Sequence, residues 1–243
     1  MKVYDKGKGI IIFDSIGDIF MIEVSPEWKS AFPEAHVGVL VMRDVSNPAH
    51  HAELEKQKAE IEEVLRAQFS AQDRAAMSAL PILQVHNTYY RRFKKSYHVQ
   101  LQLESIVWKG KSIPSMSAQV EAMFMAELKN MLLTAGHDLD TLNLPLTLDI
   151  SNGTESYKLL RGDDQMLKEG DMMIRDETGV VSSIIYGPDQ RTQITDATRN
   201  IVFTVYAPAG INEQAVSQHM HDIQEYVLMF APQAQVELIK VYS

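Results

Sequence analysis

Between residues 145 and 206 the sequence alternates short apolar runs with turn-forming residues, and this pattern restricts the possible folds more than any other feature. The runs are LTLDI, SYKLL, DMMIR, VVSSIIYG and IVFTVY, and the segments SNG, RGDD and DETG lie between them. Gly, Asn and Asp at such breaks are typical of turns between strands. The pattern therefore predicts a sheet, with Asp163 and Asp164 in a solvent-exposed turn rather than in an acid–base pair.

Apolar residues outside this region mostly follow helical spacing. The stripes that predict three helices are Leu54, Ile61, Val64, Leu65 and Phe69; Val120, Met123, Leu128, Met131 and Leu132; and Val216, Met220, Ile223 and Val227. Signals for helix ends are Ser25–Pro26 and Asn47–Pro48 as starts, Leu80–Pro81 as a break within 71–98, Ser115 or Ser117 as a start, and Gly136 as a stop.

Further apolar runs, at 19–24, 37–42 and 236–242, are predicted strands. With the run at 201–206, the last of them frames a strand–helix–strand unit that closes the chain. Helices concentrated in the first half and strands in the second favour an α+β fold. We expect a mixed β-sheet core built from the strands of 145–206, with a helix over 117–134 packed on it.

Composition narrows the class of protein. With 45% hydrophobic and 23% charged residues in 243, the chain has the composition of a globular protein, and we expect one domain over 1–243. The absence of cysteine excludes disulfides, thiolate metal sites and a cysteine nucleophile. Neither a run long enough to span a membrane nor a signal peptide is recognisable, so we expect a cytoplasmic protein without membrane contact.

Histidine and glycine motifs give no sign of a cofactor. His219 and His221 are two positions apart on a predicted helix, about 200° around its axis, so they cannot hold one metal ion. The sequence has no nucleophile elbow, phosphate-binding loop or dinucleotide-binding turn. We expect neither a metal nor a cofactor, and the 13 methionines are interpreted as core residues.

The segment NTYYRRFKKSYH, residues 87–98, is basic in a chain of net charge −9. It carries Arg91, Arg92, Lys94 and Lys95 among aromatic residues, and no acidic residue lies between Asp73 and Glu104. Such a segment either contacts the phosphates and unstacked bases of a nucleic acid or is the solvent-exposed face of a helix. In either case Tyr90 and Phe93 are expected to anchor it to the core, and Arg91 and Lys95 share a face if the segment is helical.

Three stretches occur in an order that resembles a known family. VEAMFMAELKNMLLTAGHDLDTL at 120–142 precedes YKLLRGDDQMLKEGDMMIRDETGVVSSIIYG, and TQITDATRNIVF follows. This order is similar to the B3/B4 editing domain of the phenylalanyl-tRNA synthetase β subunit, and more closely to stand-alone proteins built from that domain. The resemblance covers about 85–206, which leaves an extension at 1–84 and a helix and strand at 207–243.

In the synthetase this domain hydrolyses tyrosine mischarged onto phenylalanine tRNA, in a pocket at the edge of a sheet. The resemblance places Met123 at a pocket threonine, Ala135 at a histidine, His137 at an aromatic residue, Gly187 at a glycine and Thr204 at a glutamate. Polar groups that would recognise a tyrosine hydroxyl are thus largely replaced. Loss of such groups removes strong discrimination, so tyrosine editing by that arrangement is not expected.

Three functions stay open at this point. The first is a tRNA- or RNA-associated module, with tRNA or aminoacyl-tRNA as partner and, if it is an enzyme, an aminoacyl-tRNA hydrolase acting in trans. The second is a degenerate, non-catalytic domain that binds a small amino-acid-like ligand. The third is a protein-interaction module, suggested by the methionine-rich helix faces.

Overall fold

The computed structural model describes residues 22–243. Its helices are α1 (Pro26–Ala31), α2 (Ala52–Phe69), α3 (Arg74–Ser78), α4 (Pro81–Arg92), α5 (His98–Lys109), α6 (Ala118–Asn130) and α7 (Glu213–Phe230). Its strands are β1 (Ile22–Val24), β2 (His36–Arg43), β3 (Leu133–Asp138), β4 (Leu146–Ile150), β5 (Ser156–Lys158), β6 (Asp164–Met166), β7 (Met172–Asp176), β8 (Gly179–Ser183), β9 (Gly187–Pro188), β10 (Ile201–Ala207) and β11 (Gln235–Tyr242).

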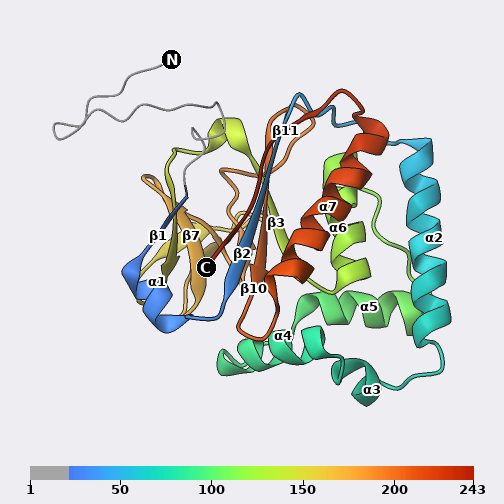
Figure 1. Ribbon diagram of the computed structural model, residues 1–243, viewed down its shortest axis with the longest axis horizontal. Helices are drawn as coiled ribbons and strands as arrows, with labels where there is room; N and C mark the ends of the chain where they lie inside the picture. The colour runs from blue at the N-terminus through green and yellow to red at the C-terminus, as the bar shows by residue number, and fades with distance from the viewer. Residues whose placement is uncertain (1–21) are drawn as a thin grey trace.

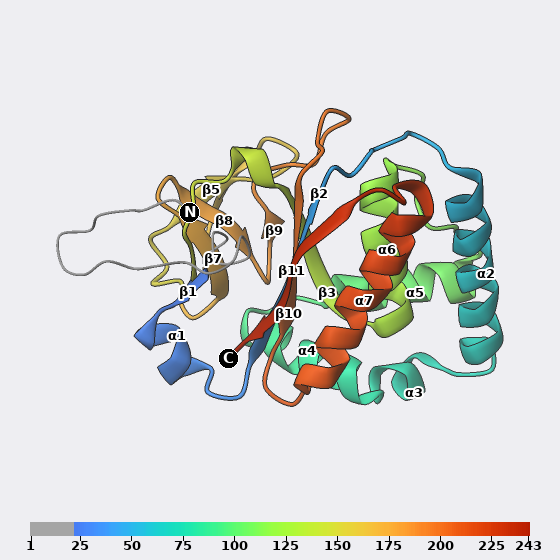
Figure 2. The same cartoon turned by 45° about the horizontal axis from the view of Figure 1, so that its top comes forward.

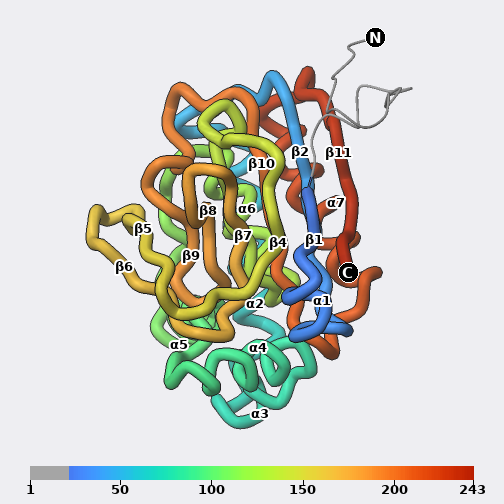
Figure 3. Tube along the Cα trace, turned by 90° about the vertical axis from the view of Figure 1, so that its left-hand side faces the viewer, coloured from blue at the N-terminus to red at the C-terminus, as the bar shows by residue number. Residues whose placement is uncertain are grey.

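Two sheets and a layer of helices make up the fold (Figures 1 and 2). One sheet has the order β1-β4-β7-β8-β9 and is mixed, because β1 runs parallel to β4 while the other neighbours are antiparallel. The other has the order β11-β2-β10-β3 and is antiparallel throughout. Helices α6 and α7 cover its outer face, and β5 and β6 form a hairpin beside the first sheet (Figure 3). The predicted α+β class with a mixed sheet is confirmed, although the strands of 145–206 divide between the two sheets.

The contact between α7 and β2 shows how closely the helices pack. A Cβ atom built on Gly38 would lie 2.6 Å from Val216 Cγ1 and 2.9 Å from Met220 Sδ. Any larger residue at position 38 would therefore push α7 away from the sheet. The predicted strand–helix–strand unit is confirmed as β10, α7 and β11, and its two strands lie on either side of β2.

Several helix starts agree with the sequence prediction. Ser25 caps α1, since its Oγ accepts a hydrogen bond from the Trp28 amide at 3.0 Å, and Pro26 is the first helical residue. Pro81 likewise begins α4. The predicted strand at 37–42 is β2, and the part of the predicted strand at 19–24 that the structure describes is β1, since 19–21 lie outside the described residues.

Two predictions of helix boundaries are wrong. Helix α6 ends at Asn130, where Met131 adopts a left-handed conformation with φ of 58°, and Gly136 lies inside β3 rather than ending a helix. The sheet decides this boundary, because β3 pairs with β10 along its whole length. Asn47 does not begin α2, which starts at Ala52; its Oδ1 accepts from the amide of Gln119 in the first turn of α6.

One further prediction within the helices is wrong, and one helix was not predicted. Val64 was expected in the apolar stripe of α2, but it is 62% exposed, whereas Leu54, Ile61, Leu65 and Phe69 are buried. Helix α5 was not anticipated, because the prediction for this region ended at residue 98. It packs against α2 and α6 and lies below α6 and α7 in the helical layer (Figure 1).

Candidate functional site

Three of the five residues that the resemblance places in a pocket lie together between the two sheets. Ala135 on β3 and Thr204 on β10 are directly paired, and the Thr204 hydroxyl donates to the Ala135 carbonyl at 3.4 Å. His137 lies two positions along β3, on the same face. This face meets the first sheet, because the hydroxyl of Tyr206, two positions beyond Thr204, hydrogen-bonds the Ser182 hydroxyl of β8.

The other two pocket positions are elsewhere. Met123 on α6 lies on the helical side of the second sheet, where its sulfur would be 3.4 Å from a Cβ atom built on Gly136. Since Gly136 alternates with Ala135 and His137 along β3, the sheet separates Met123 from them. Gly187 lies on the edge strand β9 beside β3 and adopts a φ of +82°, a conformation that favours glycine. The structure therefore assembles three of the five positions.

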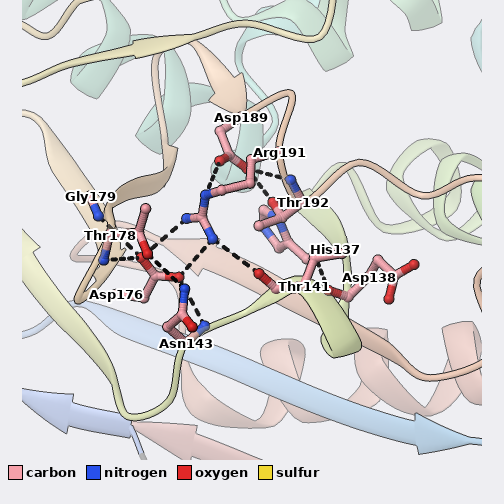
Figure 4. Close-up of polar contacts among 10 residues, drawn as sticks. All are labelled: His137, Asp138, Thr141, Asn143, Asp176, Thr178, Gly179, Asp189, Arg191 and Thr192. Carbon is pink, nitrogen blue, oxygen red and sulfur yellow. Dashed lines mark hydrogen bonds and ion pairs between the residues drawn. The ribbon is translucent and has the colours of Figure 1, made fainter.

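His137 belongs to a buried polar network (Figure 4). Its Nδ1 lies 2.8 Å from the Thr192 hydroxyl, which in turn donates a short hydrogen bond to the Asp189 carboxylate. Because a carboxylate only accepts, Thr192 must donate to Asp189, so Nδ1 of His137 carries the proton and Nε2 has the free lone pair. That Nε2 has no hydrogen-bond partner within residues 22–243.

Burial keeps the His137 imidazole neutral. The low-polarity surroundings, followed by the nearby Arg191 charge, lower the pKa of His137 to about 3. A neutral imidazole with a free nitrogen could accept a proton, but this side chain is fully buried. Its observed role is therefore to tie β3 to the loop that carries Asp189 and Thr192.

Arg191 joins that loop to the first sheet. Its Nη1 and Nη2 lie 2.9 and 3.1 Å from the two carboxylate oxygens of Asp176 on β7, and Nε lies 3.3 Å from Asp189. Nη1 also donates to the carbonyl of Thr141 at 3.1 Å. Sequence reasoning missed this ion pair, because Asp176 stands at the start of the turn segment DETG and nothing in the spacing links it to Arg191.

A cavity of about 300 Å³ opens beside this network. It lies between the β5–β6 hairpin, the turn from β7 to β8 and the loop after β9. Its lining residues are Ser156, Tyr157, Lys158, Thr178, Gly179, Val180, Asp189, Gln190 and Arg191. Asp189 and Arg191 thus belong both to the cavity wall and to the buried network, whereas none of the five pocket positions from the resemblance lines the cavity.

The basic segment forms a second surface feature, at the end of α4. Arg91, Arg92, Lys94 and Lys95 are all exposed, and none of them forms an ion pair with an acidic side chain in the part of the chain that the structure describes. We call these four residues the basic corner. The condition under which Arg91 and Lys95 would share a helical face is not met, since α4 ends at Arg92 and Lys94 has a φ of 58°.

The aromatic residues of this segment belong to the core. Tyr90 and Phe93 are buried, as predicted, and so are Tyr89 and Tyr97. The Tyr89 hydroxyl donates to the Asp171 carboxylate at 2.9 Å, and the Tyr90 hydroxyl donates to the Ile184 carbonyl at 2.6 Å. These contacts hold the end of α4 against the first sheet.

Two cations of the basic corner lie over aromatic rings. The Arg92 guanidinium lies 5.3 Å from the ring centroid of Tyr89 and 5.4 Å from that of Phe93. Lys95 Nζ lies 5.1 Å from the ring centroid of Tyr186, the residue before Gly187. Lys95 of the basic corner therefore contacts the residue that directly precedes Gly187, one of the pocket positions taken from the resemblance.

The structure also shows where the paired aspartates and the two nearby histidines of the sequence analysis lie. Asp163 and Asp164 lie at the exposed β5–β6 hairpin, in ion pairs with Arg161 and Lys158. His219 is buried and bonded to Thr134, while His221 is exposed. Across residues 22–243 there is no group of three His, Asp or Glu side chains placed to hold a metal ion, and no helix there is long and apolar enough to cross a membrane.

Comparisons with known proteins place these features in a family context. The sequence profile of the B3/4 domain matches residues 86–232. No curated protein matches the sequence. Among solved structures, an N-terminal fragment of the phenylalanyl-tRNA synthetase beta subunit from Pyrococcus horikoshii is similar, with a TM-score of 0.47 and 9% sequence identity. The match covers 93% of this chain and 55% of that fragment, so the chain spans about half of the fragment's length.

Proposed function

Because this chain belongs to the B3/4 domain family, we propose that it is a tRNA-associated module that binds the acceptor end of tRNA at the basic corner. The observation that carries the proposal is that Arg91, Arg92, Lys94 and Lys95 are exposed without an ion-pair partner among the described residues. Cations that are not neutralised within the protein are available to replace the counterions of a phosphate backbone. A cytoplasmic location is part of this proposal.

The same observation limits the strength of binding. Four phosphate contacts are few for a nucleic-acid-binding protein, and the chain as a whole carries a net charge of −9. We therefore expect weak affinity, with the logarithm of the association constant falling against the logarithm of salt concentration with a slope of about −3 to −4. Selectivity would then come from the end group of the RNA rather than from its backbone.

A titration of the purified protein with tRNA over a series of salt concentrations tests the proposal. Replacing Arg91, Arg92, Lys94 and Lys95 together with Gln should abolish measurable binding at moderate salt. The matched control replaces Lys56, Lys109, Lys111 and Lys240 with Gln, which changes the net charge equally and leaves the basic corner intact. Equal loss of affinity in both variants, or a slope near zero for the unmodified protein, would contradict the proposal.

Lys94 offers a variant that separates binding from folding. Its left-handed backbone conformation is strained for a residue with a Cβ atom, so Lys94→Gly should preserve or slightly raise stability while removing one cation. A reduced affinity in this variant cannot be attributed to unfolding. Its salt slope should decrease by about 0.7 to 0.9, as expected for one lost phosphate contact.

The cavity supports a second candidate function, in which the domain binds a small amino-acid-like molecule without catalysis. Its lining includes the carboxylate of Asp189, which lies 3.3 Å from Arg191 Nε, and the side chain of Lys158. A volume of about 300 Å³ is at the lower end of the range for small-molecule sites. Calorimetry with a panel of amino acids, in the presence and absence of tRNA, distinguishes the two candidates. Binding that Thr178→Tyr blocks and the basic-corner variant leaves unchanged would favour the second.

A further inference from the structure

Strand β11 is the outermost strand of the second sheet (Figure 3). It is eight residues long, and within residues 22–243 it pairs with β2 and with no other strand. The backbone N–H and C=O groups on its outer side are therefore not bonded to any strand of the described chain. An edge of this kind is a template on which a further strand can pair.

The side chains of β11 protect this edge weakly. Val236 is 38% exposed, and the other apolar residues of the strand are half-buried, namely Leu238, Ile239, Val241 and Tyr242. Of the two charged residues, Glu237 lies at the β-bulge and pairs with Arg43 of β2 in the same chain. Lys240 is thus the charge that an approaching strand would meet. Edges that avoid pairing are usually shorter or carry more charge.

The register with β2 fixes the face on which each side chain of β11 lies. Val241 pairs with Gly38, and a Cβ atom built on Gly38 would meet Val216 of α7. Paired residues share a face and successive positions alternate, so β11 has one face toward α7 and one face away from it. The α7 face carries Val236, Ile239 and Val241, and the opposite face carries Leu238, Lys240 and Tyr242.

Two copies of β11 complement each other about a two-fold axis perpendicular to the sheet. Such an axis makes the strands antiparallel and sets each face beside the same face of the other copy. With the axis at Ile239, and the bulged residue left out of the count, Val236 lies opposite Val241. On the other face, Leu238 then lies opposite Lys240. Moving the axis to Lys240 would set two like charges opposite each other, and moving it to Leu238 would leave Val241 unpaired.

We propose that β11 pairs antiparallel with β11 of a second copy of this chain, about a two-fold axis at Ile239. The two four-stranded sheets then form one continuous sheet. This dimer does not depend on the proposed tRNA binding. Because it uses one strand of eight residues from each copy, whereas a standard interface uses about 20 to 30 residues a side, we expect a reversible equilibrium between monomer and dimer.

Sedimentation equilibrium over a concentration series measures this equilibrium, and two substitutions of one residue test the register. Leu238→Lys sets a lysine opposite Lys240 of the second copy, whereas Leu238→Glu sets an opposite charge there, twice in each dimer. We expect a dissociation constant about 3- to 30-fold larger for Leu238→Lys than for Leu238→Glu. The net charge of −9 would favour the reverse order, and Val64→Lys and Val64→Glu on α2, away from β11 (Figure 1), measure that effect alone.

Cross-linking provides a second test, because the chain contains no cysteine. In the dimer, the thiol introduced by Ile239→Cys lies opposite its own copy, with Cβ atoms about 4.5 to 5.5 Å apart, close to the spacing of a disulfide. The thiol introduced by Val241→Cys lies on the same face but opposite Val236, so its two copies are about 14 Å apart along the strands. Mild oxidation should therefore cross-link Ile239→Cys and leave Val241→Cys monomeric on a non-reducing gel.

Three results would overturn the proposal. The first is an unmodified protein that stays monomeric over the whole concentration series, which would mean that no second copy covers β11. The second is a dimer to which Leu238→Lys and Leu238→Glu respond as the two Val64 variants do. The third is cross-linking of Val241→Cys as readily as Ile239→Cys. Unfolding midpoints show whether each variant is folded, and the concentration series of the unmodified protein decides even if the Leu238 variants are not.

Discussion

Arg191 and Asp176 form a two-point ion pair that connects the loop after β9 to β7, with nitrogen–oxygen distances of 2.9 and 3.1 Å. The Asp176 side chain is fully buried, and its carboxylate oxygens accept hydrogen bonds from Arg191 and from the amides of Asn143, Thr178 and Gly179. Two nearly parallel hydrogen bonds to a buried carboxylate are stronger than a single contact at the surface.

Replacing Arg191 should therefore destabilise the protein strongly. Arg191→Met would leave a buried carboxylate without its cation, and we expect a loss of about 3 kcal/mol in the free energy of unfolding. The control is Arg161→Met at the exposed hairpin ion pair, for which about 0 to 1 kcal/mol is expected. Urea denaturation measures both, and similar losses in the two variants would show that the Arg191 pair is no more important than a surface contact.

We expect Glu127 to make the protein less stable as the pH rises toward 8. Its Oε1 accepts from the Thr134 amide at 2.7 Å, its Oε2 has no partner in the described part of the chain, and burial raises its pKa to about 8. The folded protein therefore holds a proton that the unfolded chain releases above about pH 4.5. This group accordingly loses stabilising effect as pH rises from about 4.5 to about 8.

Glu127→Gln removes this titration while keeping the acceptor oxygen. We expect the variant to be more stable than the unmodified protein at pH 8 and close to it at pH 4.5. Urea denaturation at both pH values measures the difference, and Glu121→Gln, at a buried acid that is paired with Lys58, is the comparison. A stability difference between Glu127→Gln and the unmodified protein that is the same at both pH values would refute the prediction.

The buried histidines are expected to make the protein less stable as the pH is lowered, the opposite of the effect of Glu127. Burial is the largest cause that lowers the pKa of His86, His137 and His219, in each case to about 3, while the ordinary value is 6.5. The unfolded chain binds protons at these sites from about pH 6.5 downward, so stability falls between pH 6.5 and pH 3. His137→Gln should reduce the slope of stability against pH in this window, and an unchanged slope would exclude His137 as a contributor.

Gly38→Ala tests the packing of α7 on β2. The added methyl group would overlap Val216 and Met220, and we expect a loss of about 1 to 3 kcal/mol in the free energy of unfolding. Val216→Ala in the same chain makes room for the methyl group, so the double variant should lose less than the sum of the two single changes. If the losses of the two single variants simply add in the double variant, the methyl group at position 38 does not contact Val216.

For catalysis, we predict that the protein does not hydrolyse tyrosine from phenylalanine tRNA efficiently. Ala135 and Thr204 are directly paired and buried, and the resemblance matches these positions to a histidine and a glutamate of the synthetase. Deacylation of mischarged tRNA by the purified protein measures this. Rapid hydrolysis that Thr204→Val abolishes would show that this position is catalytic after all.

The sequence predicted elements well where local signals and tertiary packing agree. Ser25 and Pro26 begin α1 as expected, because the cap and the fixed proline torsion act within a few residues. Gly136 was misread because glycine ends helices and also permits close packing of a strand, and here it lies opposite Ile194 and Met123. Only the pairing of β3 with β10 resolves that ambiguity.

The candidate site was predictable to a smaller extent. The burial of Tyr90 and Phe93 was predicted, because aromatic side chains between exposed cations are expected to anchor the segment to the core. The contact of Lys95 with Tyr186 and the ion pair of Arg191 with Asp176 join residues far apart in the chain. Neither contact has a local signature, since turn residues and exposed cations occur in any soluble protein.

The position of β2 in its sheet affects how the chain acquires its structure during synthesis. Both hydrogen-bonded neighbours of β2, β10 and β11, belong to the last part of the chain, although β2 itself begins at His36. Six consecutive residues of β2, from Val37 to Met42, are buried once the sheet forms. While a ribosome makes the chain at about 5 to 20 residues per second, this apolar strand waits without partners until the final segments emerge. We therefore expect the nascent chain to be prone to aggregation through β2 until β10 has been made.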